Sequence, residues 1–286
     1  MWIVFAFLSA VFAALTSIFA KVGIKDVDSN LATAVRTAVV LVMAWMMTFI
    51  VGSYADISSV SSETLVFLIL SGLSTGVSWL CYFRAIQIGN VNKVAPIDKS
   101  STILTMILAF IFLGESFTFM SGIGMAVMFV GTMLMIEKKD VNSAGSFQKS
   151  WLFYAVLSAV FAALTSILGK VGIEGIESNL GTAIRTVVVL FMAWAIAFIQ
   201  GTQRQVSRIG KRNGSFLVIS GLATGASWLC FYHALQEGPA SLVVPIDKLS
   251  ILFTVLFATA FLHEKMSKKS WAGLFFLVVG TLMLLL

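Results

Sequence analysis

Long runs of hydrophobic residues, separated by short polar segments, extend through the whole chain of 286 residues. Each run is close to the about 20 apolar residues that one membrane-spanning α-helix requires, whereas a strand of a membrane β-barrel requires only about 10 residues of alternating polarity. In the first half of the chain the runs cover residues 2–20, 31–51, 65–86, 94–113 and 120–136. The pattern therefore predicts an all-α polytopic membrane protein.

The second half of the chain repeats the first. The sequence SAVFAALTSI starts at Ser9 and again at Ser158, and the lysines that follow it are Lys21 and Lys170. The offset between these lysines, 170 − 21 = 149, continues without a gap through nearly the whole of both halves. Such a fused duplication predicts a second set of five helices, at positions found by adding 149 to those of the first set.

A polar segment separates the two repeats. Its sequence, EKKDVNSAGSFQKS at residues 137–150, is too polar to cross a bilayer. We therefore divide the chain into a five-helix repeat at residues 1–137, a cytoplasmic linker at residues 138–150 and a second five-helix repeat at residues 151–286. Because five is an odd number, the second repeat has to enter the membrane in the opposite orientation. The expected architecture is ten transmembrane helices in two inverted repeats around a central cavity, a plan common among secondary transporters.

The distribution of basic residues supports this inversion, because Lys and Arg in short loops mark the cytoplasmic side of a membrane protein. In the first half they lie after the first run, as Lys21 and Lys25, and at or beyond the end of the third run, as Arg84 and Lys93. In the second half they follow the second and fourth runs, as Arg204, Arg208, Lys211, Arg212, Lys265, Lys268 and Lys269. Both termini are therefore expected on the non-cytoplasmic side of the cell membrane. This topology accounts for the net charge of +6 without a nucleic-acid partner.

Two arginines, Arg36 and Arg185, lie inside hydrophobic runs at equivalent positions. A charge in the hydrocarbon region costs at least about 2.5 kcal/mol, so such residues usually face other protein groups or a water-filled cavity. One interpretation is an interfacial anchor or a structural salt bridge. The other is a cavity lining in which the planar guanidinium recognises a carboxylate or a phosphate.

Lys21 and Lys170 end the first run of each half. Lys170 lies on the predicted outer side, where positive charge is disfavoured, and the neighbouring Lys25 is replaced there by Glu174. A lysine kept at such a position indicates a local function, which is either pairing with a carboxylate or direct contact with a substrate.

The sequence Pro-Ile-Asp-Lys begins the fourth run of each half, at residues 96–99 and 245–248. A proline in the first helical turn sacrifices no backbone hydrogen bond, and an aspartate there complements the helix dipole. We expect the Asp-Lys pair to reach Arg36 or Lys21 within its half and to form an ion network that closes one end of a pore. The motif supplies four candidate gating residues: Asp98, Lys99, Asp247 and Lys248.

Two further repeat pairs lie in the middle of the third runs. Trp79 and Trp228 are expected to fill the core or, as a second interpretation, to line an apolar substrate cavity. Cys81 and Cys230 are expected to be buried free thiols.

Glu115 and Glu264 end the fourth runs, where we expect structural roles near the lipid headgroups. The two histidines, His233 and His263, are not a repeat pair, and the chain contains no nucleophile motif, phosphate loop or metal-ligand spacing. The sequence therefore predicts neither an enzyme nor a protein with a cofactor or a metal.

Several short motifs carry a resemblance to a known family. Each half contains Asn-Leu-x-Thr-Ala-x-Arg-Thr and Pro-Ile-Asp-Lys-x-Ser, and its fourth run ends in Phe-Leu-x-Glu. The fifth runs bear glycines at Gly124, Gly131, Gly273 and Gly280. With these motifs the chain resembles the EamA family of the drug/metabolite transporter superfamily over essentially its whole length, and each half is similar to small stand-alone EamA-like proteins.

The resemblance implies a central cavity between helices one to four and six to nine, with helices five and ten at the periphery, and it implies metabolite export. One departure concerns the related small multidrug-resistance exporters, which exchange protons for organic cations at a glutamate in the first span. Residues 2–20 contain no acidic residue. The resemblance therefore does not extend to cation export by that route.

The leading hypothesis is a secondary active transporter, working as a monomeric pseudo-dimer in the lipid bilayer, that exports a small metabolite by alternating access. The charged candidate residues of one half, Lys21, Arg36, Asp98 and Lys99, sum to +2, which favours an anionic or zwitterionic, amino-acid-like substrate. A coupling proton or ion would act at Asp98 or Asp247. Two alternatives are a flippase for a lipid-linked phosphate, which predicts a lateral opening, and a non-transporting scaffold or subunit, which predicts that every charge is paired.

Overall fold

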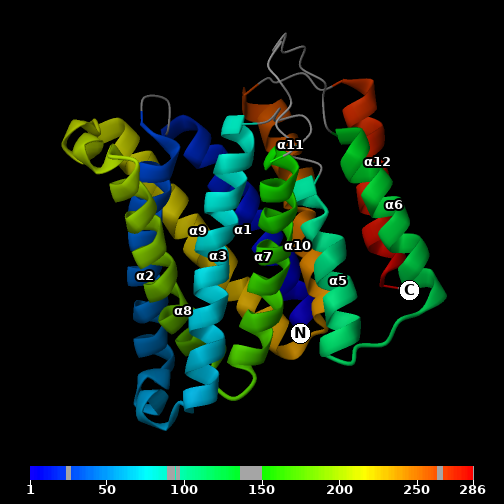
Figure 1. Cartoon of the computed structure of the whole chain (residues 1–286), viewed down its shortest axis with the longest axis horizontal. Helices are drawn as coiled ribbons and strands as arrows, with labels where there is room; N and C mark the ends of the chain where they lie inside the picture. Colours follow the sequence, from blue (N-terminus) through cyan, green and yellow to red (C-terminus); the bar gives the residue numbers. More distant parts are fainter. Residues whose placement is uncertain (24–26, 89–93, 95–96, 136–149, 263–266, 286) are drawn as a thin grey trace.

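The computed structural model describes the whole chain apart from residues 24–26, 89–93, 95–96, 136–149, 263–266 and 286. Among the described residues the regular structure is entirely helical (Figure 1). The first half contains α1 (Trp2–Gly23), α2 (Ser29–Val51), η1 (Ser53–Ser59), α3 (Ser62–Ile88), α5 (Ser101–Phe112) and α6 (Phe119–Met135). The second half contains α7 (Ser150–Ile173), α8 (Ser178–Ile199), η2 (Thr202–Arg208), α9 (Lys211–Glu237), α10 (Ala240–Lys248), α11 (Ser250–Leu262) and α12 (Lys268–Met283). Seven helical segments in this part of the chain are long and apolar enough to cross a membrane, which confirms an all-α polytopic membrane protein.

Polar caps at the ends of the hydrophobic runs set where the helices begin and end. At the start of α2 the Asp28 carboxylate accepts hydrogen bonds from the backbone N–H groups of Asn30 and Leu31. These donors belong to the first turn, which has no backbone acceptors of its own. Glu177 makes the same contacts at the start of α8. At the end of α2, Gly52 adopts φ +86°, a left-handed conformation that glycine enters without a Cβ clash.

The fourth run of the second half is a broken helix. It forms α10 and α11, which are interrupted at Leu249, immediately after the Asp-Lys pair. Pro245 lies inside α10, so the prediction of a proline in the first turn is wrong for this copy. Because proline has no N–H, the helix loses one backbone hydrogen bond there. In the first half Ser100, the equivalent of Leu249, directly precedes α5, and Pro96 lies outside the described residues.

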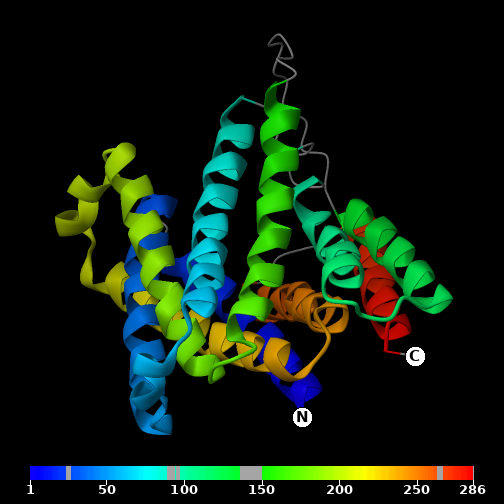
Figure 2. The same cartoon turned by 60° about the horizontal axis from the view of Figure 1, so that its bottom comes forward.

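Helices of the two repeats alternate in space. The helix α1 packs along α9, α3 along α7, α2 along α8 and α6 along α12. Serine and glycine at the crossing points allow close approach, since an added Cβ at Gly131 in α6 would lie 2.5 Å from the backbone N of Leu277 in α12. Figures 1 and 2 show α6 and α12 together at one edge of the bundle. The periphery expected for the fifth helix of each repeat agrees with this position.

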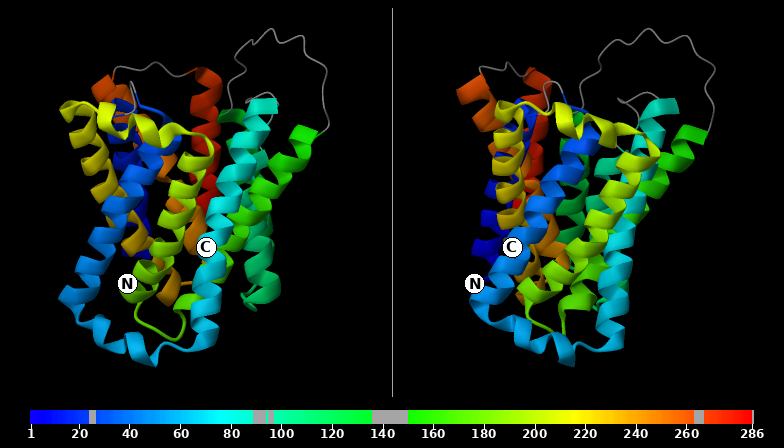
Figure 3. Two further views of the ribbon diagram at one scale, coloured as in Figure 1. Left: turned by 60° about the vertical axis from the view of Figure 1, so that its left-hand side comes forward. Right: turned by 90° about the vertical axis from the view of Figure 1, so that its left-hand side faces the viewer.

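The connections between the second and third helices of each repeat lie at opposite ends of the bundle. Figure 3 shows η1 at one end, at the bottom of both views, and η2 at the other, at the top. These two segments occupy equivalent positions in the two repeats. The first repeat therefore supplies this connection at one end of the bundle, and the second repeat supplies it at the other.

Candidate functional site

The Asp98 side chain bonds to the other repeat rather than to its own. Ser158 in α7 donates a hydrogen bond to Asp98 Oδ1 at 2.9 Å. Ser78 in α3 donates to the carbonyl oxygen of Ser158 at 3.0 Å. Within its own repeat, Asp98 lies next to Lys99, whose Nζ is 4.0 Å from Asp98 Oδ2.

Asp247 makes the same contacts in the opposite repeat. Ser9 in α1 donates to Asp247 Oδ1 at 2.6 Å, and Ser227 in α9 donates to the carbonyl oxygen of Ser9 at 3.1 Å. Lys248 Nζ is 3.8 Å from Asp247 Oδ2. The ion pairs of these aspartates that the structure describes are with the adjacent lysines, and among the described residues neither aspartate pairs with Arg36. Small hydroxyl side chains bring helices of different repeats within reach of the carboxylates, which the linear sequence does not reveal.

Lys99 and Lys248 lie close together between the repeats. Their side chains are 51% and 37% exposed, and both line one cavity together with residues of α6 and α12. The cavity measures about 10 Å³, which is about the room of a single water. The space between the two lysines is thus too small for a metabolite in this conformation.

Arg185 in α8 is buried, with 2% of its surface exposed. Its Nε donates to Ser71 Oγ at 2.9 Å and its Nη2 to Thr75 Oγ1 at 2.6 Å, both in α3. The rings of Trp228 and Tyr232 lie 5.1 and 4.9 Å from its Cζ. Its Nη1 has no hydrogen-bond partner, and no carboxylate among the described residues forms an ion pair with it. A structural salt bridge therefore does not explain why an arginine is buried at this position.

Arg36 in α2 is only partly buried, and its surroundings differ. Its Nε is shielded from solvent and lacks a hydrogen-bond partner. Among the described residues neither a hydrogen bond nor an ion pair to its side chain is formed. The two arginines share a position in the repeat, but only Arg185 is held by neighbouring side chains.

The two tryptophans of the third runs have different surroundings. Trp79 packs against Ala34, Ala193 and Ala197 in a small apolar cluster, whereas Trp228 covers Arg185. The core interpretation therefore fits Trp79 better than Trp228. Both cysteines are free, Cys81 being buried and Cys230 half-buried.

Lys170 and Glu115 hold the turn between α9 and α10. Lys170 Nζ donates to the carbonyl oxygens of Leu235 and Gly238 at 2.7 and 2.6 Å, at the C-terminal end of α9. Glu115 accepts hydrogen bonds from the backbone N–H groups of Ala240 and Ser241 at 2.6 and 2.8 Å, at the start of α10. Each charge complements the dipole of the helix end that it contacts.

Lys170 thus has backbone partners, and among the described residues no carboxylate forms an ion pair with it. Its first-repeat counterpart Lys21 lies in the last turn of α1, exposed at the opposite end of the bundle. Glu264, the counterpart of Glu115, lies outside the described residues.

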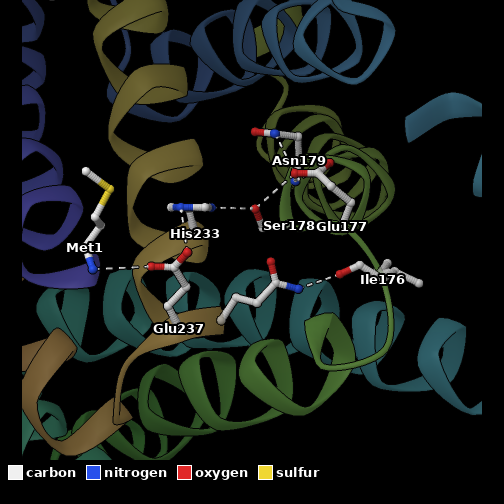
Figure 4. Close-up of polar contacts among 8 residues, drawn as sticks. Met1, Ile176, Glu177, Ser178, Asn179, His233 and Glu237 are labelled. Carbon is white, nitrogen blue, oxygen red and sulfur yellow. Dashed lines mark hydrogen bonds and ion pairs between the residues drawn. The ribbon is translucent and has the colours of Figure 1, made fainter. Parts of the chain in front are cut away.

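A further polar cluster lies where α1, α8 and α9 meet, and the sequence reasoning missed it. Figure 4 shows Ser178 beside His233 Nδ1 (3.3 Å), His233 Nε2 beside Glu237 (3.4 Å), and Glu237 beside the Met1 amino group (3.8 Å). The signal was the loss of repeat symmetry, because the equivalents of His233 and Glu237 are Arg84 and Ile88.

A lateral groove opens beside Asp98. It has a volume of about 430 Å³ and lies between α5, α6 and α7. Ile97 and Ser100, which flank the Asp98-Lys99 pair, line it together with apolar residues such as Phe129 and Val160. An apolar groove that opens sideways offers room for a hydrocarbon chain, in contrast to the predicted central cavity.

Comparisons with known proteins agree with this architecture. The EamA-like transporter family matches residues 1–137 and 149–286. An uncharacterized transporter of a Sinorhizobium species, encoded in the cobO 3′ region, is 47% identical over 136 residues, which cover 48% of this chain and 96% of the relative. An uncharacterized transporter of Archaeoglobus fulgidus is 23% identical over 280 residues, covering 97% of this chain and 95% of the relative.

A crystal structure of another protein superposes with a TM-score of 0.78, covering 97% of this chain and 94% of that chain at 14% identity. That likeness concerns the fold alone. The two family matches coincide with the two sequence repeats, and the relatives named as transporters include one of single-repeat length and one of full length. The chain is therefore a multi-pass membrane transporter that belongs to the EamA-like transporter family.

Proposed function

We propose that this transporter is a secondary active exporter of a small anionic or zwitterionic, amino-acid-like metabolite. The observation that carries the proposal is a pair of arginines inside the bundle, Arg36 and Arg185, without a carboxylate partner among the described residues. A buried charge left without a counter-ion costs several kcal/mol. Such a charge is retained where it serves a ligand or a pathway. A carboxylate on the substrate would supply the missing negative charge.

Alternating access by two inverted repeats is part of the proposal. It is supported by the direction of equivalent helices, since in Figure 1 α1 begins at the lower end of the bundle while α7 begins at the upper end. The paired contacts of Asp98 with Ser158 and of Asp247 with Ser9 add support, because each repeat makes the same contact with the other. Rocking of one repeat against the other would open the two ends in turn.

Each candidate residue has a role in this scheme. Lys21 acts near the cytoplasmic gate and Lys170 near the outer gate. Lys99 and Lys248 line one small cavity between the repeats, so the Asp98-Lys99 and Asp247-Lys248 pairs act between the two gates. Asp98 and Asp247 lie next to breaks in the fourth helices, and broken helices in transporters surround substrate and coupling-ion sites. A coupling proton or ion therefore acts at one of these carboxylates.

A second candidate function is the flipping of a lipid-linked phosphate. It is favoured by the groove of about 430 Å³ that opens sideways next to Asp98. In that case the lipid chain would lie in the groove while the phosphate contacts the basic residues. The scaffold hypothesis is disfavoured by Arg36, whose shielded Nε has no partner, since a scaffold would pair its charges.

The proposal is tested with purified protein in two steps. A panel of amino acids, other carboxylates and phosphate esters is first screened for a rise in melting temperature, because a ligand of the native state stabilises it. Uptake of each stabilising compound is then measured in proteoliposomes. Arg36→Ala or Arg185→Ala should lower uptake at least about tenfold, because contacts to charged groups contribute about 1.5–3 kcal/mol.

Arg204→Ala, at an exposed arginine in η2, is the matched control and should transport like the parent. Uptake by both core variants at the parental rate would refute the cationic site. Stabilisation and transfer of phosphorylated lipids in place of soluble metabolites would establish the flippase alternative.

A further inference from the structure

The Arg185 seat is the pair of hydroxyl groups, on Ser71 and Thr75 in α3, that accept hydrogen bonds from the guanidinium. Both hydroxyl groups also donate their own protons to backbone carbonyl oxygens. Ser71 Oγ donates to the carbonyl oxygen of Thr165 at 2.7 Å, and Thr75 Oγ1 donates to that of Ser71 at 3.0 Å. Arg185 donates its hydrogen bonds to the remaining lone pairs of these two oxygen atoms. The orientation of each hydroxyl group is held by the hydrogen bond that it donates. The guanidinium is therefore fixed to α3 by acceptors that do not rotate freely.

The same pair of hydroxyl groups exists beside Arg36. Ser220 Oγ donates to the carbonyl oxygen of Thr16 at 2.9 Å, and Thr224 Oγ1 donates to that of Ser220 at 2.7 Å. The backbones approach equally closely in both copies, since an added Cβ would lie 3.1 Å from the Arg36 carbonyl oxygen at Gly221 and 3.2 Å from that of Arg185 at Gly72. Arg36 nevertheless forms no hydrogen bond with Ser220 or Thr224.

Two further positions explain why the copies differ. Tyr232 covers Arg185 and is 2% exposed, whereas its equivalent in the first repeat is Phe83. The Tyr232 ring passes Gly169 so closely that an added Cβ would come within 2.8 Å of Cε1 and 3.2 Å of Ser71 Oγ. The equivalent of Gly169 is Ala20, so the first repeat lacks this room. Gly169 and Tyr232 together thus complete the Arg185 seat, and the first repeat has neither residue at the equivalent positions.

We infer that the two arginines have different functions: Arg185 is a fixed structural cation, and Arg36 is the residue that binds the carboxylate of the substrate. The Nε of Arg36 has no hydrogen-bond partner among the described residues, and the side chain as a whole is only partly buried, unlike that of Arg185. The Nε edge of a guanidinium binds one carboxylate with two parallel hydrogen bonds. The substrate accordingly presents one carboxylate at this point. This inference rests on the proposed function, which it narrows to a single anion-binding residue.

The experiment follows the reaction of each arginine with phenylglyoxal, a reagent that modifies accessible guanidinium groups. The purified full-length chain is treated in detergent, and modification of Arg36 and Arg185 is measured by peptide mass spectrometry. Acetate serves as the monocarboxylate probe, and chloride at the same ionic strength is its control. Neither measurement requires a known substrate or any transport, so failure of this inference is distinguishable from failure of the proposed function.

Arg36 should react at least about tenfold faster than Arg185, because a fixed buried group reacts only through local opening. Acetate, but not chloride, should slow the reaction of Arg36 and leave that of Arg185 unchanged. Equal rates for the two arginines, or an Arg36 rate that acetate does not alter, would overturn the inference.

Exchanging the two distinguishing positions supplies matched variants. Ala20→Gly with Phe83→Tyr gives the first repeat the residues that complete the Arg185 seat, and should slow the Arg36 reaction to near the Arg185 rate. Gly169→Ala with Tyr232→Phe should speed the Arg185 reaction and leave acetate protection of Arg36 intact. If acetate instead protects Arg185 and not Arg36 in the parent protein, the carboxylate-binding residue belongs to the second repeat and the inference is wrong.

Discussion

Ser158 in the second repeat donates a hydrogen bond to Asp98 in the first repeat at 2.9 Å, and this contact crosses the boundary between the two halves of the chain. The equivalent contact, Ser9 to Asp247 at 2.6 Å, crosses it in the other direction. Each repeat therefore satisfies the carboxylate of its partner. A single five-helix repeat by itself would leave that carboxylate without this donor, so each contact requires a second repeat.

The serine donors should contribute measurably to stability. Ser9→Ala or Ser158→Ala removes a hydrogen bond to a charged group, so each should lower the free energy of unfolding by about 1.5–3 kcal/mol. The measurement is a melting curve in detergent, with Ser17→Ala as control, because Ser17 is exposed and bonds within its own helix to Ala13. Equal melting temperatures for all three variants would show that these contacts do not hold the repeats together.

The contact between α6 and α12 should depend on glycine. An added Cβ at Gly131 would lie 2.5 Å from the backbone N of Leu277 and 2.7 Å from the carbonyl oxygen of Gly273, and backbone atoms have little room to move. Gly131→Ala should therefore destabilise the protein by about 1–3 kcal/mol through overpacking.

Gly122→Ala in the same helix is the control. Its Cβ would meet only the end of the Phe117 ring, at 3.1 Å, and a side chain can shift. We expect Gly122→Ala to melt at or above the parental temperature, since alanine is favoured over glycine in a helix by about 0.5–1 kcal/mol. A larger loss at Gly122 than at Gly131 would contradict the packing argument.

The proposed inversion of the repeats makes a direct prediction for η1 and η2. Ser58 and Ser207 are equivalent, exposed residues in these segments, which lie at opposite ends of the bundle. In a background with Cys81→Ala and Cys230→Ala, Ser58→Cys should react with a membrane-impermeant maleimide in intact cells. Ser207→Cys should react only after the cells are permeabilised, because its loop carries the cytoplasmic basic residues. Labelling of both cysteines from the same side would refute the inverted arrangement.

Much of the fold follows from the sequence. The runs of hydrophobic residues predict where the helices lie, because a membrane span needs a fixed length of apolar chain. The duplication predicts which positions correspond, and the polar caps at Asp28 and Glu177 end the runs by local hydrogen bonds. The broken fourth helix was not predicted, although Pro245 was its signal, because the sequence does not state in which turn of a helix a proline falls.

The side-chain partners were decided by the tertiary structure. Arg185 was predicted as a candidate, but its bonds to Ser71 and Thr75 join residues that are far apart in the chain and meet because α8 packs against α3. Lys170 and Glu115 likewise hold a turn that neither of them adjoins in sequence. Local pattern fixes the state of each segment, since it depends on near neighbours along the chain. Which polar groups meet depends on how the two repeats interlock, and that requires every helix to be in place.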